Sequence, residues 1–240
     1  MLNFAAKLSE NMANNMAKDG DQRLESFEST LSQTELFIEE HRKPIIIVVC
    51  VIAAIVLGII AVNKFYFEPR NAEAQTAMFR AEEYFGNGDF EKALNGDGNN
   101  VGFLEVMDQY GWTESGNLAC YYAGMCYLNT GDFENAIKYL KKYDGNDNIS
   151  APFAYGGIAD ANVELGNNSE AVKYYMKAAK ASKNQLTAPQ YLLRAGMTYE
   201  LLGEFENAVK TYEKIKSDYP MATEGSEIDK YILRAKTQVR

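Results

Sequence analysis

The chain has 240 residues, of which 47% are hydrophobic and 24% are charged, and its net charge is −9 at pH 7. This composition excludes a wholly disordered chain, and the acidic balance argues against a nucleic-acid partner, because binding to phosphates needs a basic surface. One histidine and three cysteines offer few ligands for a transition metal. We therefore expect no metal, no cofactor, no nucleic acid and no small-molecule substrate.

The first segment, residues 1–43, has hydrophobic residues at helical spacing with glutamates between them: Leu24, Phe27, Leu31 and Ile38. This pattern predicts an amphipathic helix that leads up to the next segment. Such a helix could dock a partner protein or lie as a stalk on a bilayer surface, and the sequence favours neither. The sequence also does not determine which residue is the N-terminus, because three methionines are candidate start residues: Met1, Met12 and Met16.

Residues 44–63 carry no charged side chain and read PIIIVVCVIAAIVLGIIAVN. At about 1.5 Å per residue, a helix of this length crosses a hydrocarbon core about 30 Å thick, so the segment predicts a transmembrane helix. We expect it to stay uncleaved, because a long segment precedes it and FYFEPR is a poor cleavage site. Phe65, Tyr66 and Phe67 resemble an aromatic anchor at the membrane interface. The basic residues are distributed almost evenly between the two sides of the predicted span. Their distribution slightly favours a cytoplasmic N-terminus.

After Arg70 the chain becomes periodic. Four segments begin with glycine and end with alanine at the same spacing: GDFEKA from Gly88, GDFENA from Gly131, GNNSEA from Gly166 and GEFENA from Gly203. The glycines are 43, 35 and 37 residues apart. A helix, glycine turn and helix with a period of about 34 residues is typical of tetratricopeptide repeats. The glycine accepts a left-handed conformation at the turn, and the small alanine lets the second helix approach the first.

These signals predict an all-α protein, in which an N-terminal transmembrane helix precedes a tetratricopeptide-type α-solenoid at residues 64–240. We place the four helix pairs at about 74–117, 117–151, 152–186 and 189–222. In the first pair, NGDGNN interrupts the second helix, which resumes at Phe103. A final helix at 224–239 has one apolar face, formed by Ile228, Tyr231, Ile232 and Ala235. We expect this helix to cap the solenoid, although it could instead fold into the groove.

The repeats lack the side chains for catalysis. His41, the only histidine, precedes the membrane segment, so no Ser-His-Asp or Cys-His arrangement is expected among the repeats. Cys120 and Cys126 lie six residues apart on one predicted helix, and they therefore point about 240° apart and cannot form a disulfide. We expect Cys120 to be a small buried residue. NGDGNN lacks the spacing and the closing glutamate of a calcium loop.

The candidate site is the concave face of the solenoid, which the first helix of each pair lines. The corresponding positions form a stripe rich in methionine and aromatic residues, here called the first-helix stripe: Met78, Phe85, Tyr121, Met125, Leu128, Phe153, Leu193 and Met197. Glu82, Asp160 and Glu200 interrupt it. Methionine adapts its shape to irregular apolar partners, so the stripe favours a groove that binds polypeptides. Alternatively, the same residues pack between neighbouring helices.

From Leu24 onward the chain resembles the single-span tetratricopeptide proteins of Bacteroidota. The likeness rests on four segments in the same order and spacing: LSQTELFIEEHRKPIII, FYFEPRNAEAQTAMFRAEEYF, ALNGDGNNVGFLEV and EIDKYI. That family is akin to the ancillary subunit that accompanies the Sec channel in proteobacteria. The resemblance implies an inner-membrane anchor, a cytoplasmic N-terminus and periplasmic repeats. It also implies association with the Sec translocon and with a membrane-bound periplasmic chaperone of the prolyl isomerase type.

We therefore predict a membrane-anchored adaptor without enzymatic activity, which holds emerging polypeptides or another chaperone in its groove. Tethering raises the local concentration of groove and client, so that weak contacts suffice. The alternative is a structural scaffold for another cell-envelope complex that binds one fixed protein partner. Mutation of a few anchor residues should abolish binding at a partner-specific site, whereas a chaperone groove should still bind its clients after the same mutations.

Overall fold

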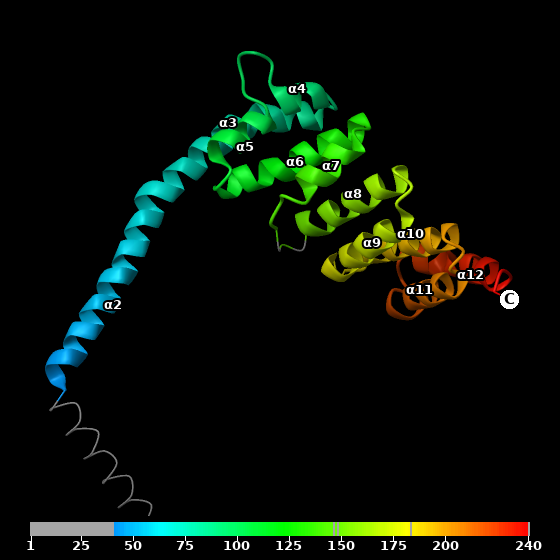
Figure 1. Ribbon diagram of the computed structural model, residues 1–240. Coiled ribbons are helices and arrows are strands. Elements are labelled where there is room, and N and C mark those ends of the chain that lie inside the picture. Colours follow the sequence, from blue (N-terminus) through cyan, green and yellow to red (C-terminus); the bar gives the residue numbers. More distant parts are fainter. Residues whose placement is uncertain (1–40, 146, 148, 183, 240) are drawn as a thin grey trace, which may run out of the picture. The chain divides into compact units, whose positions relative to one another are not determined.

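The computed structural model describes residues 41–145, 147, 149–182 and 184–239 (Figure 1). Every regular element in these residues is helical, which confirms the all-α prediction. The described residues fall into two units, one that ends at Lys64 and one that begins at Phe65. The amphipathic helix predicted within residues 1–43 lies almost wholly outside the described residues.

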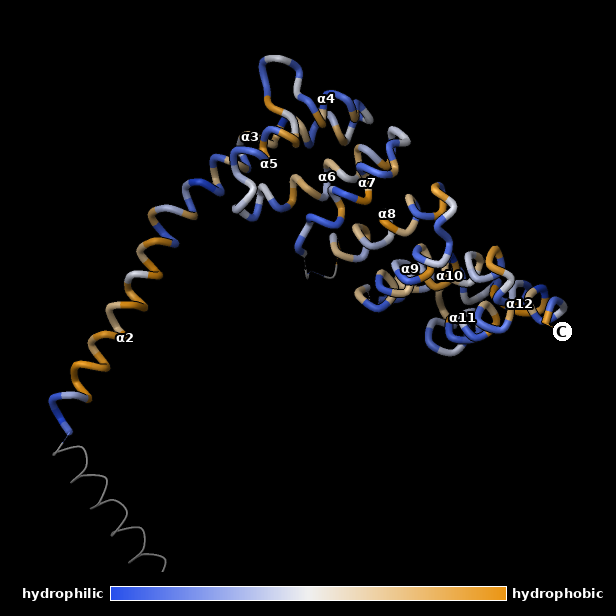
Figure 2. Tube along the Cα trace, in the orientation of Figure 1, coloured by the Kyte–Doolittle hydropathy of each residue, from blue (hydrophilic) through white to orange (hydrophobic). Residues whose placement is uncertain are grey.

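The described part of the first unit is one apolar helix, α2 (Arg42–Val62). None of its residues is buried, and its large side chains are more than half exposed in most positions, with Leu57 at 66% and Ile59 at 64%. Its length and composition are sufficient for a membrane span. Figure 2 shows the continuous hydrophobic colouring of this helix, which differs from the alternation seen along the repeats. A single π-helical turn, η1 (Asn63–Phe67), follows it in the chain.

The second unit consists of helices that pair in chain order and stack on one another (Figure 1). The first group is α3 (Glu68–Gly86) with α4 (Phe90–Asn95) and α5 (Phe103–Tyr110). The following pairs are α6 (Glu114–Thr130) with α7 (Phe133–Leu140), α8 (Ser150–Glu164) with α9 (Asn168–Ser182), and α10 (Ala188–Leu201) with α11 (Phe205–Asp218). Each pair packs on the next, α7 against α8 and α9 against α10. The predicted α-solenoid is confirmed.

The glycine at each turn adopts the predicted left-handed conformation, with φ between 74° and 83° at Gly88, Gly131, Gly166 and Gly203. In each turn the glycine N–H donates to the carbonyl three residues earlier, and the next N–H donates to the carbonyl five residues earlier. These two bonds satisfy the last carbonyls of the first helix and reverse the chain. The same local signal therefore produces the same turn four times.

Small residues let the two helices of a pair approach closely. The alanine five residues after each turn glycine is fully buried: Ala93, Ala136, Ala171 and Ala208. Within the first helices, a Cβ at Gly124 would lie 2.5 Å from Leu140 Cγ, and a Cβ at Gly196 would lie 2.2 Å from Tyr212 Cε1. The large side chain of the second helix thus occupies the space that a larger residue on the first helix would need.

The insertion in the first repeat is organised by Asp97. Its carboxylate accepts the hydroxyl hydrogen of Tyr84 at 2.7 Å and the backbone N–H groups of Asn99 and Asn100 at 2.8 and 2.7 Å. The bond from Tyr84, followed by those from Asn100 and Asn99, holds the pKa of Asp97 well below its usual range. Both carboxylate oxygens of Asp97 therefore accept hydrogen bonds that fix the shape of the insertion. After it, α5 begins at Phe103, as the sequence predicts.

The last helix, α12 (Thr223–Lys236), ends the solenoid. It packs against α10 and α11 through Ile228, Ile232 and Ala235, which are buried, while Tyr231 lies partly buried beside them. The helix therefore takes the place of the first helix of a further pair, and the cap prediction is confirmed. It does not lie across the earlier first helices α6 and α8.

Candidate functional site

The structure places the first-helix stripe in three environments. Phe153 and Met197 are exposed, at 42% and 43% of their surface. Five residues are half-buried: Phe85, Tyr121, Met125, Leu128 and Leu193. Met78 is only 1% exposed and belongs to the core that α3, α4, α5 and α6 build together. Its assignment to the binding surface is therefore corrected, because helices of the first repeat and α6 of the next enclose it.

The half-buried members of the stripe on α6 fill the joint between repeats. A Cβ at Gly157 of α8 would lie 3.3 Å from Met125 Sδ and 3.4 Å from Leu128 Cδ2, so these side chains lie against α8. The ring of Tyr121 lies 5.6 Å from that of Tyr143. Packing between helices, the alternative reading of the stripe, therefore describes these residues.

The accessible part of the stripe lies on α8 and α10. Phe153 is on α8, whereas Leu193 and Met197 lie four residues apart on one face of α10. Leu201, which is outside the stripe and 67% exposed, follows at the same interval on that face. A Cβ at Gly156 of α8 would meet the Tyr191 ring of α10 at 2.4 Å, so the two helices are in contact. We call Phe153, Leu193, Met197 and Leu201 the α8–α10 surface.

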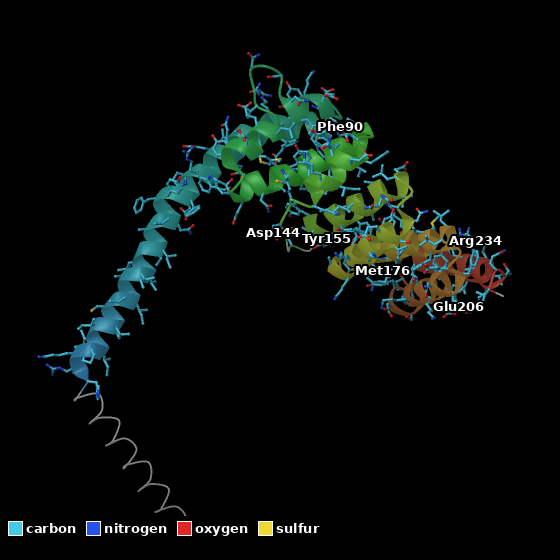
Figure 3. The ribbon with its side chains drawn as sticks, viewed as in Figure 1. Phe90, Asp144, Tyr155, Met176, Glu206 and Arg234 are labelled. Atoms are coloured by element: carbon cyan, nitrogen blue, oxygen red, sulfur yellow. The ribbon has the colours of Figure 1, made fainter. Side chains whose placement is uncertain are left out.

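Two acids on the first helices are paired with arginine one repeat further along. Arg194 Nη1 lies 2.8 Å from both carboxylate oxygens of Asp160, and Arg234 Nη2 lies 2.9 Å from Glu200 Oε1. Both pairs are separated by 34 residues in the sequence. These ion pairs therefore connect α8 to α10 and α10 to the capping helix α12. Arg234, which forms the second pair, is labelled in Figure 3.

A tyrosine from the second helix completes each pair. The hydroxyl of Tyr175 donates to Asp160, and that of Tyr212 donates to Glu200 at 2.7 Å. Burial, and after it the hydrogen bond to the acid, raises the pKa of both tyrosines. Each carboxylate thus accepts hydrogen bonds from a tyrosine of its own repeat and an arginine of the next. Two of the three acids that interrupt the stripe in the sequence, Asp160 and Glu200, are thus paired with arginine in the fold.

Neutralising the more buried of these acids should destabilise the solenoid more. The Glu200 side chain is 16% exposed and the Asp160 side chain is 35% exposed. We expect Glu200→Gln to lower the free energy of unfolding by about 1–2 kcal/mol and Asp160→Asn by about half of that, because solvent screens the second pair more. Urea unfolding of the full chain in detergent, followed by circular dichroism, measures both. Glu206→Gln, at an exposed position, is the control, and an equal loss in all three would contradict the role of the pairs.

A third acid, Glu82 on α3, has a different environment. None of the ion pairs in the described part of the chain includes it, and burial raises its pKa above the usual 4.5. The charge of Glu82 in turn contributes to the raised pKa of Tyr122, after the effect of burial. Glu82 is thus a carboxylate on the first helices without an arginine partner.

The raised pKa predicts the sign of a pH effect. A carboxyl whose folded pKa exceeds its unfolded pKa stabilises the fold when protonated, and this contribution is lost as the pH rises through the folded pKa. We therefore expect Glu82→Gln to raise the unfolding temperature at pH 7, with a gain that shrinks as the pH falls toward 4.5. Thermal unfolding of both proteins across this range measures the gain. The exposed Glu134→Gln controls for the loss of one acidic charge, and a gain from Glu82→Gln that grew on acidification would contradict the prediction.

The two thiols of α6 are unsuited to nucleophilic chemistry. Cys120 and Cys126 are buried on α6 and form no disulfide, which confirms the burial predicted for Cys120. Burial raises the pKa of both, that of Cys126 to about 12, so the nucleophilic thiolate is scarce at neutral pH. Within the described residues, no group of three or more histidine, cysteine, aspartate and glutamate side chains could hold a metal ion.

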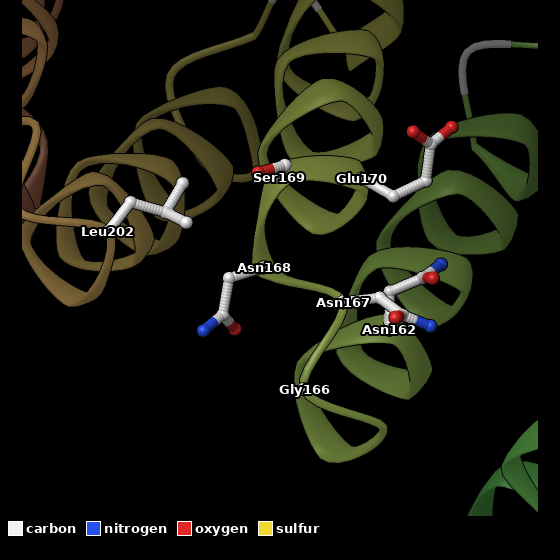
Figure 4. A pocket seen from close by; sticks show the side chains of 7 residues that line it. All are labelled: Asn162, Gly166, Asn167, Asn168, Ser169, Glu170 and Leu202. Carbon is white, nitrogen blue, oxygen red and sulfur yellow. The ribbon is translucent and has the colours of Figure 1, made fainter.

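A hollow of about 430 Å³ lies at the turn between α8 and α9, and Figure 4 shows the side chains that line it. It is lined by Asn162, Gly166, Asn167, Asn168, Ser169, Glu170 and Leu202. Its one acid, Glu170, pairs with Lys173 at 2.8 Å. The hollow offers a polar rim and no arrangement of acid, base and nucleophile, so we assign it no chemistry.

The stacked pairs, the repeated glycine turns and the buried alanines define a tetratricopeptide-repeat solenoid. Three segments match sequence models of the tetratricopeptide repeat: residues 119–148, 154–185 and 190–220. Proteins with this fold typically serve as non-catalytic scaffolds for protein–protein interaction.

The individual relatives agree with this class. A tetratricopeptide repeat-containing protein of Methanocaldococcus jannaschii is 32% identical over 101 residues, 42% of this chain and 17% of the relative. Tetratricopeptide repeat protein 29 of Macaca fascicularis is 28% identical over 109 residues, 43% of this chain and 22% of the relative. The chain thus spans about a fifth of the length of these relatives.

Among solved structures, a kinesin-light-chain-like protein of Podosopora anserina with nearly identical TPR-like repeats superposes with a TM-score of 0.53. The two chains are 15% identical, and the match covers 70% of this chain and 87% of the other. At this identity the likeness concerns the fold alone.

Sequence reasoning missed the pairing of the acids. Asp160 and Glu200 read as charges that interrupt an apolar stripe, although an arginine follows each of them by one repeat period, at Arg194 and Arg234. That spacing was the available signal, because residues one period apart occupy equivalent positions on neighbouring first helices.

Proposed function

We propose that the protein is a membrane-anchored adaptor that binds polypeptides near the Sec protein-translocation channel through its repeats. The observation that carries the proposal is α2, an apolar helix without a buried residue that directly precedes a solenoid of protein-binding repeats. The repeats indicate protein partners in general, whereas the anchor, the compartment and the channel are parts of the proposal.

The exposure of α2 supports a bilayer as its surroundings. Each Å² of apolar surface left in water costs about 25 cal/mol, so a helix with such side chains along its whole length is unfavourable in aqueous solution. A bilayer removes this cost, and the helix satisfies its own backbone groups. Arg42 and Lys43 at its start, and Lys64 after its end, carry the charges that flank a span.

The α8–α10 surface supports binding of an apolar segment. It combines an exposed phenylalanine with methionine and leucine side chains, a composition that fits irregular apolar partners. The ion pair between Asp160 and Arg194 holds α8 and α10 together, so a partner meets a preformed surface. The half-buried residues of α6 extend this surface toward the first repeat without offering the same exposed area.

The channel and the topology follow from the resemblance to the single-span repeat proteins of Bacteroidota. By that resemblance, the N-terminal segment is cytoplasmic, α2 lies in the inner membrane, and the repeats are periplasmic. A solenoid placed there meets polypeptides as they leave the channel, or binds a membrane-bound periplasmic chaperone. The domain limits of this proposal are 1–43 for the cytoplasmic segment, 44–63 for the span and 64–240 for the repeats.

A specific observation also favours a structural scaffold with one fixed partner. The exposed apolar area of the stripe is confined to the α8–α10 surface, which is smaller than a continuous groove along all repeats. Binding energy concentrated in a few residues is typical of a defined protein interface. The two functions differ in one property, because only a chaperone-like groove suppresses the aggregation of unrelated unfolded proteins.

Replacing two residues tests the binding surface. We expect the double variant Phe153→Ser and Met197→Ser to lose at least about ten-fold in recovery of copurified proteins from mild detergent, because both exposed anchors become polar. Quantitative mass spectrometry of the copurified proteins measures the loss. Lys177→Ser with Lys210→Ser, two exposed positions on second helices, is the matched control. Unchanged recovery with the double variant would contradict the assignment of this surface.

A further inference from the structure

Three aromatic rings gather where the repeat unit begins. Trp112, in the turn between α5 and α6, stacks on Tyr66 with ring centroids 5.5 Å apart and planes 12° apart. It also meets Phe67 edge-on at 5.2 Å, and Tyr66 and Phe67 lie 5.6 Å apart. We call Tyr66, Phe67 and Trp112 the aromatic cluster. Despite these mutual contacts, the three side chains stay 55%, 41% and 47% exposed, so the cluster is not part of the core.

The turn that carries Trp112 is firmly held. The Thr113 hydroxyl oxygen accepts the N–H of Gly116 at 3.0 Å, and the Asn71 side chain of α3 accepts the N–H of Ser115 at 2.9 Å. A Cβ at Gly116 would lie only 1.9 Å from the carbonyl oxygen of Tyr110, so the backbone is closely packed. The exposed indole is therefore positioned by the first repeat and does not belong to a loose loop.

The chain keeps this cluster close to the end of the apolar helix. Tyr66 follows Val62 by four residues, so it lies within about 14 Å of the end of α2 in any conformation of the linker. If α2 spans a bilayer, this distance places the cluster at the headgroup region, where tryptophan and tyrosine are enriched. The exposed charges beside it, on Lys64, Glu68 and Glu114, suit this hydrated layer and not the hydrocarbon core.

We propose that the aromatic cluster docks the first repeat onto the interfacial layer of the lipid bilayer. The inference rests on the membrane anchor of the proposed function and extends it, because Trp112 belongs to the repeats and lies far from the span in sequence. The domain is then attached to the membrane at two points, the linker after α2 and the turn between α5 and α6. This second attachment restrains the height and the rotation of the solenoid above the bilayer, compared with a domain on a single stalk.

The single tryptophan of the chain makes Trp112 its own fluorescent probe. The full chain is reconstituted into vesicles of phosphatidylcholine and phosphatidylglycerol that contain no other protein. The lipids carry a spin label either at the headgroup or at the middle of the acyl chain. We expect the headgroup label to quench Trp112 at least about two-fold more than the chain label, because interfacial aromatic rings lie at headgroup level.

The matched control moves the probe away from the cluster. In the variant W112F with F79W, the tryptophan replaces an exposed ring of α3, 13 residues after Tyr66 and about 20 Å further along a helix. This probe should respond to aqueous acrylamide and to neither lipid label. In Tyr66→Ser, which removes the stacked ring, quenching of Trp112 by the headgroup label should fall.

Flotation and resistance to alkaline extraction of the same vesicles separate the two proposals. A chain that floats and resists extraction, with Trp112 unquenched by either label, would overturn the docking and leave the anchor standing. Stronger quenching by the chain label would also overturn the interfacial placement. A chain that neither floats nor resists extraction would overturn the anchor and the docking together.

Discussion

Replacing Tyr212 with alanine is expected to lower the free energy of unfolding of the repeat domain by about 3–5 kcal/mol. The side chain is fully buried, lies against Gly196 of α10, and stands 5.5 Å from the Tyr231 ring of α12. Its hydroxyl also donates to Glu200. The substitution leaves a cavity where α10, α11 and α12 meet and removes a hydrogen bond from a buried acid. Urea unfolding of the full chain in detergent, followed by circular dichroism, measures the loss.

The conservative substitution separates the ring from its hydroxyl. Tyr212→Phe keeps the packing and loses only the bond to Glu200, so we expect a loss of about 1 kcal/mol. Stability in a solenoid is close to a sum of terms within repeats and between neighbours, and the loss should be greatest in the last pair and the cap. Hydrogen exchange along α12 would locate it. Equal losses in the two variants would show that the ring does not join the cap to the last repeat.

Two arginines in the middle of α2 are expected to release the chain from membranes. In the double variant Ile52→Arg and Val56→Arg, each charge adds about 2.5–3.5 kcal/mol to the cost of membrane insertion, on the scale measured for helix centres. Most of the protein should then be extracted by alkaline carbonate, whereas the unmodified chain stays with the membrane pellet. Immunoblots of both fractions give the ratio.

The control for this experiment keeps the hydrophobicity. Ile52→Leu with Val56→Leu changes shape at the same positions without adding charge, and it should remain in the pellet. Because the repeat unit contains neither position, its unfolding transition should be the same in all three proteins. If the arginine variant resists extraction as well as the unmodified chain does, α2 is not what holds the protein in the membrane.

The features that sequence predicted correctly arise from local requirements. A turn such as the one at Gly131 needs a left-handed residue, and a close helix pair needs a small residue such as Ala136, so both leave a fixed spacing in the sequence. The same is true of the insertion, whose glycines and asparagines signal a turn before Phe103. These signals repeat with the period of the fold, and their agreement makes the fold predictable.

The solvent accessibility of the first-helix stripe could not be predicted from the sequence, because it depends on how neighbouring first helices pack. Gly157 lets α8 approach α6, and Met125 and Leu128 become packed at that joint. Met78 is enclosed by helices of the first repeat and the next. The contact of Trp112 with Tyr66 likewise joins residues 46 positions apart in the sequence, and no periodic pattern links them.

Site-specific photocrosslinking from Met197 tests the central claim most directly. A photoreactive amino acid replaces Met197 on the α8–α10 surface of the full chain. Crosslinking is then carried out in intact membranes from cells that are exporting proteins. We expect crosslinks from Met197 to subunits of the Sec channel, to a membrane-bound periplasmic chaperone or to polypeptides in transit, and few of these from the same probe at Lys210 on α11. Equal crosslinking from both positions, or crosslinks from Met197 only to proteins unconnected with export, would contradict it.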